Sequence, residues 1–400
     1  MINVGVFGYG TVGSGVVEVL SKNAEVIEKH VHDKVNVKAI LDLRDFPGDE
    51  FESLITHDVD TIISDPEISV ICETMGGIGA AYKFTKAALS AGKSVCSSNK
   101  ELVAAYGPEL ISLAKKNNCS YKFEASVGGG IPIIRPLMDA VTADKIESVT
   151  GIVNGTTNYM LTKMAEEGAE FDDVLKEAQA KGYAEANPDA DILGLDAMRK
   201  LAILSSLVYG KTVKTDSIYT EGITNISARD FKYAGKLNKS IKLLAKYVDA
   251  PEGAYAMVSP FMLSETNPLY SVRGVFNAIM VHGNMLDDAM FFGRGAGKLP
   301  TASAVCGDVV ECAKNIGKHL PCDWADEVVE LNGRNASKRA FFVRVKASDK
   351  DKALNLFGKV EAVDAGFSDE FSFVTEKMSE EAFEKKASEI EIINRIRMDK

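Results

Sequence analysis

Residues 178–200, AQAKGYAEANPDADILGLDAMRK, combine closely spaced carboxylates with an apolar repeat. The carboxylates in and beside this stretch are Glu177, Glu185, Asp189, Asp191 and Asp196. Pro188 and Asp189 are typical of a first helical turn, and Gly210 is typical of the residue that ends a helix. The sequence therefore predicts one helix from residue 189 to residue 209.

Lys200 lies on the apolar side of this predicted helix. On a helical wheel at about 100° per residue, Lys200 is about 20° from Leu193 and close to Leu204, and Asp196 is about 60° from Leu193. An exposed Asp196–Lys200 ion pair would stabilise the helix by only about 0.3 kcal/mol. A pair that points inward must instead overcome a desolvation penalty of several kcal/mol, and such charges are typical of functional sites. We therefore expect both residues to take part in the chemistry.

The same stretch resembles the signature of homoserine dehydrogenases. That pattern is A-x3-G-aromatic-small, then Asn/Asp-Pro, then D-aliphatic-x-G-x-D-x3-K. The matching positions are Ala178, Gly182, Tyr183, Ala184, Asn187, Pro188, Asp191, Ile192, Gly194, Asp196 and Lys200. The resemblance implies an NAD(P)-dependent oxidoreductase that interconverts L-aspartate 4-semialdehyde and L-homoserine, a step toward threonine and methionine.

Length and composition narrow the class of protein. A chain of 400 residues is long enough for two or three domains, and a net charge of -11 without a basic run argues against a nucleic-acid surface. No apolar run approaches the length of a membrane span, and the first residues already resemble a core strand, so we expect a cytoplasmic protein. The 6 cysteines form no C-x2-C pair, which favours buried thiols over zinc or disulfides.

A glycine turn follows the first apolar strand. Residues 3–7 precede Gly8-Tyr9-Gly10-Thr11-Val12-Gly13, and an apolar-periodic helix comes next. Strand, glycine turn and helix in this order form the dinucleotide fingerprint, in which helix N–H groups meet the pyrophosphate. A glycine turn without a ligand is the alternative. The predicted cofactor contacts are Gly8, Gly10, Thr11, Val12 and Gly13.

The end of the second strand, residues 35–41, bears on the choice of cofactor. Asp42 would favour NAD by binding ribose hydroxyls, whereas Arg44 would favour NADP by pairing with its 2′-phosphate. The sequence leaves both cofactors open.

Strands and helices then alternate up to about residue 125. Strands are predicted at 69–73, 94–97 and 121–125, helices at 80–89 and 101–116, and a short apolar segment at 61–64. This alternation predicts a doubly wound parallel sheet, which binds its ligands at the carboxyl ends of the strands.

Lys100 follows one of these strands within Ser97-Ser98-Asn99-Lys100. The segment resembles the family's Asn-Lys-x-Leu-Val motif, which implies a lysine between nicotinamide and substrate. An exposed surface lysine is the alternative.

A second feature at these strand ends is the glycine-rich turn EASVGGGIP, residues 124–132. Its carbonyl groups could converge on one cation. The resemblance implies a Na+-like ion held by Glu124 and by the carbonyl groups of Val127, Gly129 and Ile131. The residues alone predict only a tight loop that passes between domains.

From about residue 146 the pattern changes to that of a substrate domain. The segment from Gly151 matches the family's G-x-x-N-G-T-x-N motif, in which Gly155 and Thr156 would contact the amino acid. Strands are predicted at 212–219, 241–248, 255–263, 275–282 and 285–292. They indicate an open, largely antiparallel sheet whose exposed face suggests a homodimer or homotetramer.

Two later segments extend the resemblance. Residues 293–305 resemble the family's return crossing, so we expect helix 301–315 to pack on the nucleotide domain and Gly295, like Gly182, to contact the cofactor. Residues 340–398 resemble an ACT regulatory domain whose second strand, between 358 and 369, is short or missing. Effector control and a role in assembly both stay open.

Together these patterns predict an α/β protein. A Rossmann nucleotide domain would span residues 1–135 and be completed by 300–320, an α+β substrate and dimerisation domain would span 136–300, and an ACT-like βαβ domain would span 338–400. We expect Lys200 as proton donor, Lys100 as a second cation, and Glu185, Asp191, Asp196 and Thr156 around the substrate. The alternatives are a non-catalytic NAD(P)-binding sensor and a related amino-acid semialdehyde reductase.

Overall fold

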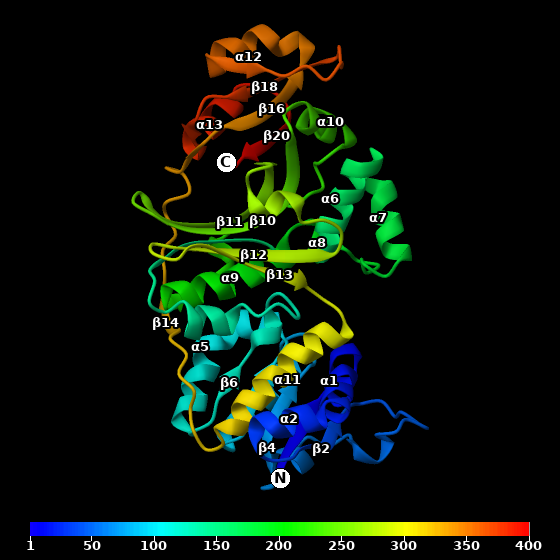
Figure 1. Ribbon diagram of the computed structural model, residues 1–400. Coiled ribbons are helices and arrows are strands. Elements are labelled where there is room, and N and C mark those ends of the chain that lie inside the picture. Colours follow the sequence, from blue (N-terminus) through cyan, green and yellow to red (C-terminus); the bar gives the residue numbers. More distant parts are fainter. Residues whose placement is uncertain (400) are drawn as a thin grey trace. The chain divides into compact units, whose positions relative to one another are not determined.

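The computed structural model describes residues 1–399 and divides the chain into two compact units. The first unit contains residues 1–144, 202–214 and 291–329, and the second contains residues 145–201, 215–290 and 330–400. Figure 1 shows the elements of both. Within the described part of the chain, no helix is long and apolar enough to cross a membrane.

The first unit is built on a six-stranded sheet with the order β3-β2-β1-β4-β5-β6, and every neighbouring pair is parallel. Its strands are β1 (Ile2–Phe7), β2 (Val35–Leu41), β3 (Ile55–Thr56), β4 (Ile68–Glu73), β5 (Ser94–Ser97) and β6 (Tyr121–Lys122). Its helices include α1 (Thr11–Lys22), α2 (Ala24–Val31), α3 (Asp60–Ile63), α4 (Gly79–Ser90), α5 (Lys100–Lys116) and α11 (Lys298–Lys314). Two short strands, β8 (Lys211–Thr212) and β14 (Ala325–Val328), pair separately from this sheet. This strand order is that of a Rossmann sheet and confirms the predicted fold class.

Helix α11 returns from far along the chain and packs against α1 in one apolar core (Figure 1, yellow and blue). Val305 and Val309 of α11 are fully buried there, as are Val16 and Val17 of α1. A Cβ atom on Gly15 would lie 3.0 Å from the Cβ of Ala302, so glycine permits this close crossing. The predicted return of this helix to the nucleotide unit is confirmed.

One detail of the first unit differs from the sequence-based expectation, because the strand predicted at 121–125 ends at Lys122. Residues Glu124–Ser126 instead form a 3-10 turn. That turn directs the carboxylate of Glu124 at the backbone N–H groups of Ile133 and Ile134, so a buried polar group overrides the strand propensity of the segment. The short apolar segment at 61–64, for which no element was predicted, lies mostly in helix α3.

The second unit is built on a sheet with the order β13-β12-β7-β10-β11-β20-β16-β18-β17, and β9 pairs with β11. Its strands in the substrate region are β7 (Ile146–Ile152), β9 (Tyr219–Thr220), β10 (Lys239–Ala250), β11 (Gly253–Ser264), β12 (Phe276–Gly283) and β13 (Asp287–Arg294). Its helices there are α6 (Gly155–Glu167), α7 (Phe171–Ala180), α8 (Asp189–Ile192), α9 (Leu195–Tyr209) and α10 (Ala228–Lys236). The last residues of α9 and β13 belong to the first unit.

The predicted helix from 189 to 209 is two helices, and this prediction was wrong in one respect. Gly194, with φ +80°, breaks it between α8 and α9. Leu193, which the helical wheel placed in the apolar stripe, is consequently 42% exposed. The strand predicted at 212–219 was also wrong, because only β8 and β9 are extended and a 3-10 turn at Thr215–Ser217 separates them.

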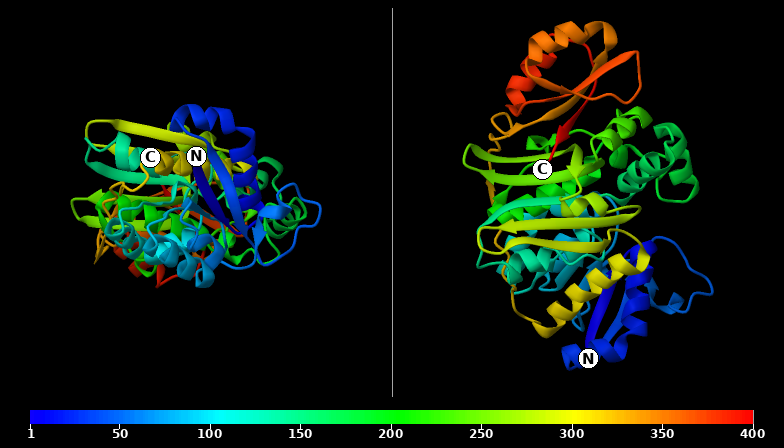
Figure 2. Two further views of the ribbon diagram at one scale, coloured as in Figure 1. Left: turned by 90° about the horizontal axis from the view of Figure 1, so that it is seen from below. Right: turned by 45° about the horizontal axis from the view of Figure 1, so that its top comes forward.

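Residues 341–398 form a βαββαβ module with the strand order β17-β18-β16-β20. Its elements are β16 (Phe341–Lys346), α12 (Lys350–Phe357), β17 (Val360–Ala362), β18 (Glu370–Thr375), α13 (Glu380–Ala387) and β20 (Ile392–Met398), and a small ladder joins β15 (Lys338–Arg339) to β19 (Met378–Ser379). The second strand is present but has only 3 residues. Strand β20 pairs in parallel with β11, so the module continues the sheet of the substrate region (Figure 2, red and green).

Candidate active site

The glycine turn after β1 has the geometry that a dinucleotide needs. Gly8 has φ +92°, and the Thr74 hydroxyl donates a hydrogen bond to its carbonyl at 2.9 Å. A Cβ atom on Gly13 would lie 1.8 Å from the Gly8 carbonyl oxygen, whereas a Cβ atom on Gly10 would meet nothing within 4 Å. Gly13 is thus required for the turn itself, and Gly10 leaves open space before the N-terminus of α1. Pyrophosphate fits this arrangement, with Thr11 and Val12 opening the helix.

Asp42 and Arg44 lie together just after β2. The Arg44 guanidinium donates to both carboxylate oxygens of Asp42, at 2.9 and 3.0 Å, and the backbone N–H of Tyr9 donates to one of them at 2.8 Å. The Arg44 hydrogen bonds hold the pKa of Asp42 well below its ordinary value. The arginine is exposed, and its partner ties this strand end to the glycine turn. The structure therefore brings both residues that bear on cofactor choice to one place.

A buried carboxyl group links the carboxyl ends of β4 and β5. Glu73 accepts hydrogen bonds from the Ser97 hydroxyl at 2.6 Å and from the Met75 backbone N–H at 2.9 Å. Beside it, the Asn99 side chain accepts from the Leu102 N–H at 3.1 Å and so caps helix α5. Lys100, the first residue of that helix, is half-buried at the strand ends, where the sequence predicted it.

The Glu73→Gln variant is expected to be more stable than the wild type at about pH 8 and equally stable at about pH 4.5. Burial raises the pKa of Glu73 from 4.5 to about 7. Between these values the unfolded chain has lost the proton that the folded chain retains, so folding stability falls as pH rises through this window and stays lower above it. The neutral amide avoids this penalty, so a gain of about 3 kcal/mol is expected above the window.

Thermal unfolding of both proteins at the two pH values measures this effect. Because other groups titrate equally in both proteins, only the difference between the variant and the wild type matters. A difference that is the same at both pH values would contradict the assignment.

The loop 124–131 places Glu124 among hydrogen-bond donors. One carboxylate oxygen accepts from the N–H groups of Ile133 and Ile134 at 2.6 and 2.8 Å, and the other accepts from the backbone N–H and the Nε of Arg135 at 2.8 and 3.2 Å. Two accepted hydrogen bonds use the lone pairs of each oxygen. The carboxylate of Glu124 therefore does not fit the role of a cation ligand in this arrangement.

The backbone of the same loop lies against the return crossing. Gly129 has φ +56°, a Cβ atom there would lie 2.6 Å from the carbonyl group of Gly295, and the Gly130 N–H donates to the Arg294 carbonyl at 3.2 Å. Glycine at 129 is needed for this approach. The carbonyl groups of Val127, Gly129 and Ile131 as ligands of Na+, and Gly295 as a cofactor contact, stay predictions.

In the second unit, Lys200 and Asp196 form a buried ion pair on α9. The ammonium donates to the carboxylate of Asp196 at 2.7 Å and to the carbonyl of Val153 at 2.7 Å. Lys200 is 9% exposed and Asp196 4% exposed. The predicted inward orientation of Lys200 is confirmed, and the charge is held by a partner as burial requires.

Asn154 joins this pair to a second carboxylate. Its side-chain amide donates to Asp191 at 2.6 Å and to Asp196 at 2.9 Å, and its side-chain oxygen accepts from the Thr157 N–H at 2.9 Å and so caps α6. Burial raises the pKa of Asp191, against the lowering effect of the Asn154 hydrogen bond. Sequence analysis did not assign Asn154 a role, although an asparagine before a predicted helix is a recognisable cap.

The other residues predicted to bind the substrate lie on two segments, the start of α6 and the loop after α7. The Thr156 hydroxyl donates to the Tyr183 carbonyl at 2.6 Å, and Gly155 begins α6 where a Cβ atom would lie 3.0 Å from the Val275 carbonyl oxygen. Glu185 lies on an exposed loop, where its backbone carbonyl accepts from Gln179 at 3.1 Å. Gly182, with φ +72°, is exposed in the same loop. The hydrogen-bonded cluster thus unites Asp191, Asp196, Lys200 and Asn154, with Glu185 outside it.

A Rossmann sheet with an open glycine turn, together with a buried carboxylate–ammonium pair, defines the class as an NAD(P)-dependent dehydrogenase. The family model "Homoserine dehydrogenase" matches residues 132–310, and "Homoserine dehydrogenase, NAD binding domain" matches residues 8–124. The chain belongs to the homoserine dehydrogenase family.

Relatives and solved structures agree with this assignment. The chain is 37% identical over 367 residues to the homoserine dehydrogenase of Neisseria gonorrhoeae, covering 88% of this chain and 83% of the relative. It is 39% identical over 322 residues to that of Bacillus subtilis, covering 79% and 73%. A homoserine dehydrogenase structure from Thiobacillus denitrificans superposes with a TM-score of 0.90 at 33% identity, covering 100% of this chain and 98% of that one.

A hyperthermophilic archaeal homoserine dehydrogenase in complex with NADPH matches with a TM-score of 0.68 at 29% identity, covering 80% of this chain and 99% of that one. The enzyme is an NAD(P)-dependent oxidoreductase that interconverts L-aspartate 4-semialdehyde and L-homoserine in threonine and methionine biosynthesis.

Proposed function

We propose that Lys200 transfers the proton in this reaction and that Asp196 positions it. The observation that supports this role is the buried ammonium held between the carboxylate of Asp196 and the carbonyl of Val153, each at 2.7 Å. An ammonium has three N–H donors. With two of them held in this way, the third can be directed at the substrate oxygen.

The bound cofactor supplies the hydride in the reducing direction. As the aldehyde carbon of the semialdehyde accepts the hydride, negative charge develops on its oxygen. The Lys200 ammonium stabilises that charge and then donates its proton, which completes the hydroxyl group of homoserine. In the oxidising direction the neutral amine of Lys200 accepts the hydroxyl proton.

The carboxylates around Lys200 suit the other end of the substrate. Asp191 is fixed by Asn154 and is partly accessible, so we propose that it binds the substrate ammonium. Glu185 and Thr156 are proposed to complete this subsite. Lys100 is proposed as a second cation, on the resemblance of its motif to the family's.

A spectrophotometric assay with NAD+ and NADP+, run separately, tests the reaction. Homoserine is expected to reduce at least one cofactor. The matched compound 2-aminobutyrate, which lacks the hydroxyl group, is expected to reduce neither. Equal rates with and without homoserine for both cofactors would contradict the proposed activity.

The Arg44→Ala variant is expected to shift cofactor preference toward NAD+. Loss of a charge-assisted contact to a 2′-phosphate should lower kcat/KM for NADP+ about tenfold. Use of NAD+ should be unchanged or improved, because the released Asp42 carboxylate can accept from ribose hydroxyls. The exposed neighbour Leu43, replaced by alanine, is the control. An equal loss with both cofactors would show that Arg44 does not bind the phosphate.

The C-terminal module is proposed to be ACT-like, on the support of its βαββαβ order and its sheet order β17-β18-β16-β20. A homodimer or homotetramer and a cytoplasmic location stay predictions from the sequence. Light scattering of the purified enzyme would give the subunit number.

A further inference from the structure

Glu221 directly follows β9, within the segment 219–223, and accepts hydrogen bonds from two arginines of strand β20. Its carboxylate accepts from Arg395 at 2.7 Å, from Arg397 at 2.8 Å and from the Tyr219 hydroxyl at 3.0 Å. Burial opposes the ionisation of Glu221, but the two guanidinium groups outweigh it, and its pKa lies below the ordinary value. The carboxylate of Glu221 therefore holds both arginines of the last strand of the C-terminal module to the substrate region.

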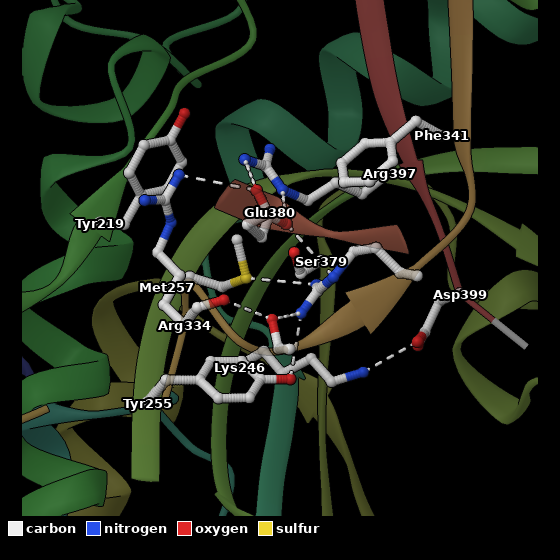
Figure 3. A network of polar contacts seen from close by, with 12 residues as sticks. Tyr219, Lys246, Tyr255, Met257, Arg334, Phe341, Ser379, Glu380, Arg397 and Asp399 are labelled. Carbon is white, nitrogen blue, oxygen red and sulfur yellow. Dashed lines mark hydrogen bonds and ion pairs between the residues drawn. The ribbon is translucent and has the colours of Figure 1, made fainter. Parts of the chain in front are cut away.

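Arg397 also belongs to a larger network of polar contacts (Figure 3). Arg397, which is fully buried, donates to both oxygens of the fully buried Glu380 of α13, at 2.7 and 3.0 Å. The guanidinium of Arg334 lies 3.8 Å above the ring of Tyr219. Charge-assisted, bidentate contacts of this kind demand a fixed geometry, because any displacement leaves a buried charge without its partner.

The segment 219–223 also packs against the turn between α8 and α9. The Ile223 N–H donates to the Ile192 carbonyl at 2.8 Å. A Cβ atom on Gly222 would lie 2.0 Å from that same carbonyl oxygen and 2.6 Å from the Cα of Leu193. A Cβ atom on Gly194 would be 3.3 Å from a Thr220 methyl group. At Gly222 the two segments thus touch backbone to backbone, which leaves no room for a side chain at this position.

This turn separates the two aspartates of the candidate site. Asp191 precedes it on α8 and Asp196 follows it on α9, and the Asn154 amide bridges both within 2.9 Å. The backbone of this turn therefore links the segment that carries Asp191 to the helix that carries Asp196 and Lys200.

We propose that Glu221 is a positioning residue, through which the C-terminal module sets the turn between α8 and α9 and so aligns Asp191 with the Asp196–Lys200 pair. The proposal rests on the roles proposed above for these three residues. Glu221 itself does not touch the reacting groups. It acts through the backbone of Gly222 and Ile223.

The Glu221→Gln variant tests this role, because it removes the charge and keeps the volume. The KM for homoserine is expected to rise and kcat to fall, together lowering kcat/KM about thirtyfold, since small misplacements of reacting groups are costly. The dissociation constant for NADPH, measured by fluorescence, should stay unchanged. A purely structural clamp would lower thermal stability without this separation of substrate and cofactor effects.

The chain offers a matched control in Glu370→Gln. Glu370 of β18 also ties the same module to the substrate region, because it accepts from Arg229 of α10 at 2.6 Å and from Arg344, its neighbour on β16, at 2.7 and 2.8 Å. The contacts of Glu370 and Arg344 reach α10 and do not include the turn at 192–194. A comparable loss of thermal stability is expected, with homoserine kinetics within about twofold of the wild type.

A second variant, with a smaller change to the contacts of Glu221, keeps the proposal testable if Glu221→Gln does not fold. Arg395→Met leaves Arg397 on Glu221 and is expected to raise the KM for homoserine in the same direction by a smaller factor. Wild-type kinetics in both Glu221→Gln and Arg395→Met would overturn the proposal, as would an equal kinetic defect in Glu370→Gln. A Lys200→Met enzyme that remains active would instead show that the proposed site roles are wrong, which separates the two failures.

Discussion

Replacing Lys200 by methionine is expected to lower kcat for homoserine oxidation by about three orders of magnitude. Methionine keeps most of the buried volume but can neither exchange a proton nor stabilise charge on the substrate oxygen. The affinity for NADPH should not change, because the residues that form the glycine turn belong to the other compact unit. Single-turnover rates and fluorescence titration with NADPH measure the two quantities separately.

Two further variants test the roles of Lys200 and Asp196 separately. Lys200→Arg retains the positive charge but loses ready proton transfer, so it should bind homoserine and still turn over slowly. Asp196→Asn leaves the ammonium buried beside a neutral partner and should lower both kcat and thermal stability. A Lys200→Met enzyme with more than about a tenth of wild-type kcat would rule out the proton-transfer role.

Gly13→Ala and Gly10→Ala are expected to fail in different ways. A Cβ atom at position 13 would lie 1.8 Å from the Gly8 carbonyl oxygen, so the turn must change shape, and both stability and cofactor binding should be lost. A Cβ atom at position 10 meets nothing within 4 Å, so the fold should persist. That methyl group would nevertheless occupy the space through which the pyrophosphate approaches, and binding should weaken at least tenfold.

Thermal unfolding with and without NADPH distinguishes these outcomes. Gly13→Ala should unfold several degrees below the wild type. Gly10→Ala should match the wild type without cofactor and show little further stabilisation when NADPH is added. Normal NADPH binding by Gly10→Ala would mean that the cofactor does not approach the turn from this side.

The features that the sequence predicted correctly are local patterns. The glycine turn after β1 follows from the order of strand, turn and helix within about a dozen residues. The buried position of Lys200 follows from the spacing of the apolar residues around it. Lys200 lies within α9, which is one continuous helix from Leu195 to Tyr209. The return of α11 to the nucleotide unit came from the resemblance of residues 293–305 to a family segment, and the structure confirms it.

The features that the sequence did not predict depend on contacts between distant segments. Gly194 looks like an ordinary helical position until the backbone of Gly222 lies against the residues before it. Asn154 becomes part of the site only because β7 ends beside α8 and α9. No periodicity reports such pairings, since the residues concerned are more than 25 positions apart.

The order of synthesis gives helix α11 a consequence for how the enzyme is made. The strands of the nucleotide-binding sheet leave the ribosome first, but the part of α1 that packs against α11 stays uncovered until residues 298–314 have been translated. The whole substrate region is translated in this interval, before α11. During this interval the nascent chain exposes the valine-rich surface that α11 covers in the folded enzyme.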